Sequence, residues 1–66
     1  MMDDLGYETG RNAGRHWMTE ILKTHDQHAA RELYNARMQE RSGTRGLSTF
    51  ETGFFAGAEE VLNGQG

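Results

Sequence analysis

Apolar and small residues recur every three or four positions in three stretches of the chain, which is the spacing of one buried face on an α-helix. These stretches cover about residues 4–23, 25–41 and 48–62. The chain has no proline and few β-branched residues, which favours helix over strand. The pattern predicts an all-α fold, a small three-helix bundle forming a single domain over residues 1–66, with residues 1–3 and 64–66 frayed.

The two breaks between the predicted helices carry capping signals. Thr24 and Gln27 have the spacing of a capping box, in which Thr24 caps the second helix and Gln27 reaches back. Ser48 and Glu51 form a second such pair at the start of the third helix, after a loop at 42–46 that contains two glycines. One continuous helix over 4–41 is the alternative. The side chains expected to point inward from the second helix are Ala30, Leu33, Tyr34 and Met38.

One eight-residue phrase occurs twice, at 7–14 and at 50–57, and both copies read aromatic-Glu-Thr-Gly-x-x-Ala-Gly. On a helix the aromatic residue and the two glycines lie at i, i+3 and i+7 and share a face. Small residues on such a face let a neighbouring backbone approach closely. We expect the first and third helices to pack through these faces, or two copies of the chain to do so across a two-fold axis. The residues expected at this packing are Tyr7, Gly10, Gly14, Phe50, Gly53 and Gly57.

Length and composition limit the classes of protein that the chain fits. A domain of 66 residues buries a small core and is marginally stable, so a partner or a second copy would stabilise it. The chain has no cysteine, which excludes disulfides and thiolate metal sites. The N-terminus lacks the basic region followed by an apolar region that is typical of a signal peptide, and no apolar run approaches about 20 residues. We therefore expect a cytoplasmic protein outside the membrane.

The residues that carry chemistry do not form a known catalytic pattern. Ser42 and Ser48 are expected in a turn or a cap, Asp26 and Glu51 are explained by capping, and no phosphate-binding glycine loop is present, so we expect no enzyme and no cofactor. His25, His28 and Glu32 share one helical face and offer N, N and O ligands for a zinc-type ion. A zinc-stabilised module is therefore one alternative, and a solvated start of the second helix is the expectation.

The aromatic residues of the chain indicate a protein whose function is to bind another protein. Phe54 and Phe55 are adjacent, and we expect one of the two rings to be exposed or covered by a second chain. The leading hypothesis is a small regulator or inhibitor, of the kind encoded by phages and mobile elements, that occupies a surface of a larger partner, with homodimerisation as a further expectation. Its expected binding residues are Trp17, Tyr34, Phe54 and Phe55, with Arg31, Arg37 and Arg41 as charged support.

The charges are distributed unevenly along the chain, although the net charge is only −3. Residues 11–45 hold all seven Lys and Arg with four acids, whereas the flanks hold six acids and no base. A basic middle segment between acidic ends supports an alternative, a ribosome- or nucleic-acid-associated accessory factor. The residues that would carry this binding are Arg11, Arg15, Arg31, Arg37 and Arg41.

The first copy of the phrase also has a likeness outside this chain. The segment Gly6-Tyr7-Glu8-Thr9-Gly10-Arg11-Asn12-Ala13-Gly14-Arg15 resembles the opening of the ribosome modulation factor family, small bacterial proteins with relatives on mobile elements. The stretch 50–58 is loosely similar to the aromatic and glycine pattern of that family's second half. The resemblance covers about twenty residues. It implies a small, non-enzymatic accessory factor.

Overall fold

The computed structural model of the chain describes residues 2–43 and 46–64 and contains three α-helices. They are α1 (Met2–Thr24), α2 (Gln27–Arg41) and α3 (Thr49–Leu62). The predicted all-α three-helix fold is confirmed, with each helix end within two residues of its expected position. Residues 2–3, expected to fray, belong to α1, and the expectation for residues 1 and 65–66 lies outside the described residues.

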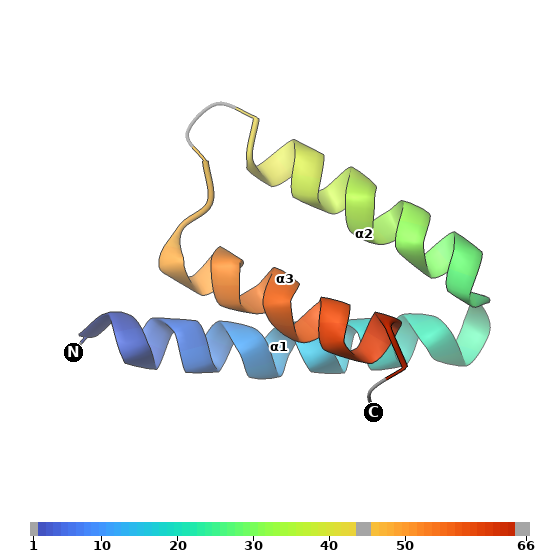
Figure 1. Cartoon of the computed structure of the whole chain (residues 1–66), viewed down its shortest axis with the longest axis horizontal. Helices are drawn as coiled ribbons and strands as arrows, with labels where there is room; N and C mark the ends of the chain where they lie inside the picture. The colour runs from blue at the N-terminus through green and yellow to red at the C-terminus, as the bar shows by residue number, and fades with distance from the viewer. Residues whose placement is uncertain (1, 44–45, 65–66) are drawn as a thin grey trace.

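Helices α1 and α3 lie side by side and run in the same direction, while α2 returns in the opposite direction beside them (Figure 1). The α-carbons extend over 36 × 26 × 14 Å, so the three helices form a flattened bundle. The closest packing in the chain is between α1 and α3, and α2 touches the other two much less. In the described part of the chain no helix combines the length and hydrophobicity needed to cross a bilayer.

Glycines allow the backbones of α1 and α3 to approach closely. A Cβ atom added to Gly10 would overlap the carbonyl oxygen of Phe50, and a Cβ on Gly53 would overlap that of Tyr7. In the repeated phrase Gly10 corresponds to Gly53 and Tyr7 corresponds to Phe50. The contacts are therefore reciprocal, as across an approximate two-fold axis between the helices. The same relation recurs one turn later, where Gly14 meets the carbonyl of Phe54 and Gly57 meets that of Arg11.

The turn between α1 and α2 is closed by a residue other than the one expected. Asp26 is the N-cap of α2, with extended backbone angles, and its carboxylate accepts a 2.8 Å hydrogen bond from the Ala29 amide. The predicted capping box is wrong, because Thr24 ends α1 and the Gln27 side chain donates instead to the carbonyl oxygen of Leu62. The predicted break is correct, and α1 and α2 are separate helices.

We expect Asp26→Ala to lower the free energy of unfolding by about 1 kcal/mol, since the substitution removes the hydrogen bond to the first turn of α2. Thr24→Ala is the matched control and is expected to change stability by less, because Thr24 does not cap α2. Urea unfolding followed by circular dichroism measures both variants. A larger loss of stability for Thr24→Ala than for Asp26→Ala would show that Thr24 is the cap of α2.

The ends of α3 follow the sequence signals. The predicted capping box is confirmed, since the Glu51 amide donates to the Ser48 hydroxyl at 3.1 Å and the Ser48 amide donates to the Glu51 carboxylate at 3.1 Å. At the other end the Gly64 amide donates to the Val61 carbonyl at 3.0 Å. Gly64 has φ 82°, a conformation that other residues rarely adopt, so the expected stop at residues 63–64 has a physical reason.

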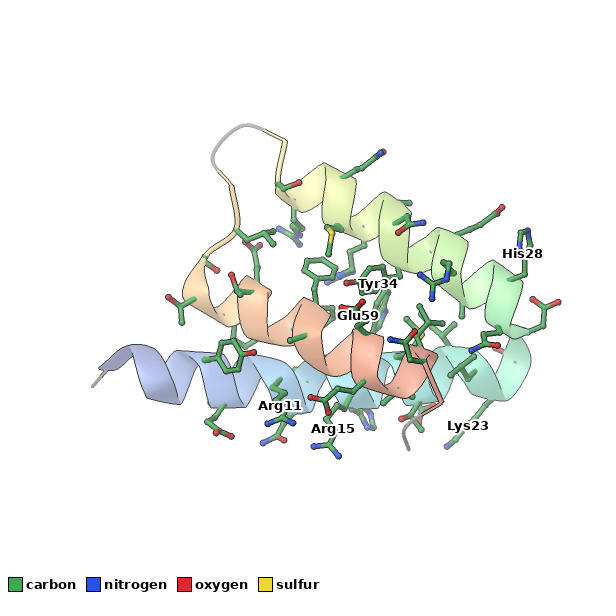
Figure 2. The ribbon with its side chains drawn as sticks, in the orientation of Figure 1. Arg11, Arg15, Lys23, His28, Tyr34 and Glu59 are labelled. Carbon is green, nitrogen blue, oxygen red and sulfur yellow. The ribbon has the colours of Figure 1, made fainter. Side chains whose placement is uncertain are left out.

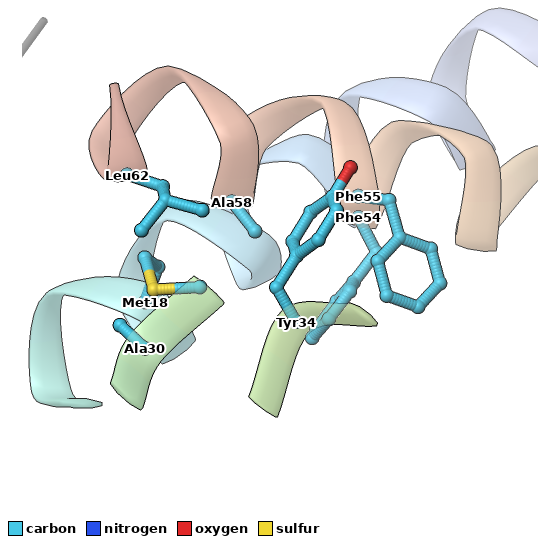
Figure 3. Close-up of a cluster of buried hydrophobic side chains, with 7 residues drawn as sticks. All are labelled: Met18, Ala30, Tyr34, Phe54, Phe55, Ala58 and Leu62. Carbon is cyan, nitrogen blue, oxygen red and sulfur yellow. The ribbon is translucent and has the colours of Figure 1, made fainter. Parts of the chain in front are cut away.

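The core lies between α3 and the other two helices (Figure 3). Aromatic rings fill one end of it, and aliphatic side chains fill the other. Burying these groups supplies the main stabilisation of a small helical domain. The buried apolar residues are Met18, Ala30, Tyr34, Phe54, Phe55, Ala58 and Leu62.

Candidate partner-binding groove

An open groove of about 850 Å³ lies between α1 and α2. Its apolar lining comes from both helices, with half-buried side chains on α1 and exposed ones on α2. Leu33 is 40% exposed and lines the groove together with the apolar side chains of Trp17 and Ile21. The residues that line the groove are Trp17, Ile21, Leu33, Ala36, Arg37, Gln39 and Glu40.

A row of aromatic rings leads into this groove from α3. The ring of Phe50 is 42% exposed and stacks on Phe54, with the ring centroids 6.4 Å apart. Phe54 in turn packs against Trp17, with centroids 5.2 Å apart. A smaller cavity of about 120 Å³ opens beside this row. Its lining residues are Arg37, Arg41, Phe50, Glu51, Phe54 and Phe55.

Arg37 lies at the boundary between the groove and the smaller cavity and lines both. Its guanidinium carbon is 5.2 Å from the centroid of the Trp17 ring and 5.0 Å from that of Phe54. A cation over aromatic faces is attracted by the ring quadrupoles, and two such rings restrict the side chain. The structure thus brings Arg37, an expected charged binding residue, together with two expected aromatic ones, Trp17 and Phe54.

Three of the expected aromatic binding residues have no exposed ring. Phe54 is 8% exposed, Phe55 is 2% exposed, and Tyr34 is also buried. The expectation that one of the two adjacent phenylalanines is exposed is wrong for this chain, because α2 lies over the side of α3 that carries Phe55. There the edge of Phe55 meets the ring of Tyr34, with centroids 5.6 Å apart. Of the four, Trp17 alone lines the groove.

The hydroxyl group of Tyr34 belongs to the edge of the core. Tyr34 on α2 points toward α3, where Glu59 lies (Figure 2). Burial raises the pKa of Tyr34, the negative charge of Glu59 raises it further, and the positive charge of Arg31 opposes the change. The phenol therefore stays neutral at ordinary pH and acts as a packing group with a polar tip.

The other arginines mostly join helices of the same chain. Arg31 donates to the Asn63 side chain at 3.2 Å, and Arg41 lies 3.8 Å from the Glu51 carboxylate. Both contacts link α2 to α3. Ion pairs at such exposed positions contribute about 0–1 kcal/mol each. On α1, two further arginines lie on one side of the helix (Figure 2) and pair with one carboxylate of α3; these residues are Arg11, Arg15 and Glu60.

The histidines do not converge with an acid on a common point. His28 and Glu32 pair at 3.3 Å on the exposed face of α2, whereas the ring of His25 lies 2.9 Å from the Thr24 hydroxyl and 3.2 Å from the Ile21 carbonyl. Among the side chains that the structure describes, those of residues 6–43 and 46–64, no three of His, Asp or Glu are grouped as metal ligands. His25, His28 and Glu32 therefore do not form the alternative zinc site as arranged here.

Leu33 is the residue of the groove that the sequence pattern misplaced. We expected it to point inward, but Ala30 and Tyr34 take the core face of α2. Leu33 instead shares a second stripe with Ala29 and Ala36, which have the same helical spacing. That second stripe is the sequence signal that could have identified the groove.

Comparisons of the chain with protein-family models, curated protein sequences and solved structures found no match.

Proposed function

We propose that this chain is a small, non-enzymatic regulator that docks an apolar helix of a larger protein in the groove between α1 and α2. The observation that carries the proposal is the exposed Leu33, which stands beside Trp17 and Ile21 in the groove. Amphipathic helices commonly bind in apolar grooves of this kind through a few anchor side chains. Occupying such a helix would block or redirect the partner, as an inhibitor does.

The composition of the groove supports this proposal. Its apolar part comes from an aromatic, two aliphatic residues and an alanine, and its polar part lies on α2. Interfaces often place a buried aromatic at the centre and polar groups at the rim. Trp17 fits the role of anchor because it is half-buried and already packed against Phe54.

The alternative, binding to a ribosome or nucleic acid, has weaker support. It requires a set of free arginines, and four of the five candidates lie within 4.0 Å of a side chain of α3 or of its C-cap residue Asn63. The net charge of −3 also opposes attraction to phosphate. Binding of RNA that falls steeply with salt would favour this alternative.

The test of the proposed function uses a charge placed in the groove. We expect Leu33→Asp and Ala36→Glu to keep the helical fold and to reduce partner binding at least about 10-fold, because each sets a carboxylate against an apolar helix. The measurement is affinity capture from the host lysate with the wild-type chain and each variant as bait, followed by titration of the proteins captured.

The matched control for these variants is Asn35→Asp. It adds the same charge to the same helix, at an exposed residue outside the groove lining. Circular dichroism confirms that all variants remain folded. If the captured proteins bind Leu33→Asp and Ala36→Glu as tightly as wild type, the groove is not the binding surface and the proposal is wrong.

A further inference from the structure

Arg37 differs from most of the other cations that the structure describes in what surrounds it. Arg11, Arg15 and Arg41 each lie within 4.0 Å of a carboxylate of α3. Lys23 pairs with Glu20 on its own helix, at 3.1 Å. Among the described residues Arg37 has no such carboxylate and lies over two aromatic rings instead. Of the described arginines, two lack a carboxylate partner, Arg31, which donates to the neutral Asn63 side chain, and Arg37, which lies at the edge of the groove.

The position of the Arg37 guanidinium suits an incoming carboxylate. The guanidinium carbon lies over the rings of Trp17 and Phe54, whose centroids are themselves 5.2 Å apart, so both rings contact it from one side, and the N–H groups at the edge of the guanidinium are its donors. A carboxylate binds such an edge through two parallel hydrogen bonds. Because the Arg37 side chain is already half-buried and restricted, it loses little further conformational entropy when the carboxylate binds.

The neighbouring charges limit how many acids can bind here. Glu40 also lines the groove and forms no ion pair with Arg37. It repels a second acid placed at its end of the groove. Arg41 lines the smaller cavity but is already 3.8 Å from Glu51. We therefore expect the site to accept one carboxylate and to reject an acidic run.

Space with a partly apolar lining lies on both sides of Arg37. On one side is the groove with Leu33, and on the other is the cavity of about 120 Å³ beside Phe50. That cavity is too small for a ligand of drug size and suits a single apolar side chain. A ligand that fills both spaces must carry its carboxylate between apolar groups.

We propose that the occupant of the groove is an amphipathic helix of a partner protein that carries one Asp or Glu between apolar residues, with its carboxylate bound to Arg37. This inference rests on the proposed function, since it names the chemistry of the partner helix. The apolar residues lie along the groove and in the smaller cavity. The acid fixes the orientation and register of the helix, because only one position along it can reach Arg37.

The experiment is a selection from a displayed library of helical peptides against the immobilised full chain, with counter-selection against the Ala36→Glu variant. We expect the selected peptides to be enriched in one Asp or Glu flanked by apolar residues. In a selected peptide, replacing that acid by its amide should weaken binding about 10-fold on the wild-type chain. On Arg37→Gln, the acid and amide forms should bind alike.

Two further variants keep this test decisive. Arg37→Lys retains the charge but loses the planar pair of donors, so it should restore only part of the difference between acid and amide. Circular dichroism reports whether Arg37→Gln remains folded, and if it does not, Arg37→Lys with the peptide pair gives the answer. Equal effects of the acid on the wild-type chain and on Arg37→Lys would contradict bidentate binding.

The other outcomes separate the two proposals. Peptides that need the groove but show no enrichment of an acid overturn this inference and leave the proposed function standing. Failure to select any peptide that discriminates wild type from Ala36→Glu overturns both. A wild-type chain that sediments as a dimer, and an Ala36→Glu variant that sediments as a monomer, would assign the groove to a second copy and overturn the inference.

Discussion

Replacing Gly14 by alanine is expected to destabilise the protein by roughly 3 kcal/mol. A Cβ atom at this position would overlap the Phe54 carbonyl oxygen and lie 2.6 Å from its carbonyl carbon, so α1 and α3 must move apart. The obstruction is backbone, which cannot rotate away as a side chain does. The total stability of a domain this small is roughly 3–10 kcal/mol, so the loss is a large part of it. Urea unfolding followed by circular dichroism measures the change.

The control for this variant is Gly6→Ala in the same helix. There the nearest atom to an added Cβ is the Thr49 methyl carbon at 3.8 Å, an ordinary contact. Alanine is a better helix former than glycine by about 1 kcal/mol, so Gly6→Ala is expected to stabilise the protein by up to that amount. The same substitution thus gives opposite signs at two positions of α1. A stabilising effect at both would show that α1 and α3 do not pack through Gly14.

The Phe55→Ala variant is expected to lose about 3–5 kcal/mol of stability and to be largely unfolded at 37 °C. Its ring is 2% exposed and packs edge-on against both Tyr34 and Phe54, so the truncation leaves a cavity where α2 meets α3. This expected loss differs from the prediction made from the sequence, in which Phe55 is a binding residue for a partner.

The control for Phe55 is Phe50→Ala on the same helix. Phe50 is 42% exposed and contacts the core through Phe54, so its truncation is expected to cost about 1 kcal/mol. Thermal unfolding of both variants, at one protein concentration, measures the difference. Equal losses would mean that Phe55 does not lie in the core, and a folded Phe55→Ala chain would restore it as a surface residue.

The local features of the fold could be predicted from the sequence. The three helices follow from the spacing of apolar residues, and the start of α3 follows from Ser48 and Glu51, because capping needs only neighbours along the chain. The repeated phrase also identified the glycines that lie at the α1–α3 contact. The capping pair spans four residues and each copy of the phrase spans eight.

The sequence contains the second apolar stripe of α2 but leaves the rotation of α2 open, so the groove, which depends on that rotation, was not predicted. Helix α2 carries two adjacent apolar stripes, one with Tyr34 and one with Leu33, and the sequence does not say which faces the core. The structure buries Tyr34 and exposes Leu33. The same rotation covers Phe55 and sets Arg37 over its two rings. The choice between Thr24 and Asp26 as cap was equally open, since both residue types accept hydrogen bonds from amides.

The reciprocal contact between α1 and α3 has a consequence for the rate of folding. It joins residues about 40 positions apart in sequence, such as Gly10 and Phe50, while the contacts of α2 with its neighbours are few. A chain whose tightest interface is so distant must close a long loop before it gains that contact energy. Helical bundles usually fold quickly because their contacts are local. This chain should therefore fold more slowly than a helical bundle of the same length in which successive helices pack together. The expected rate-limiting step is the association of α1 with α3 through the two copies of the repeated phrase.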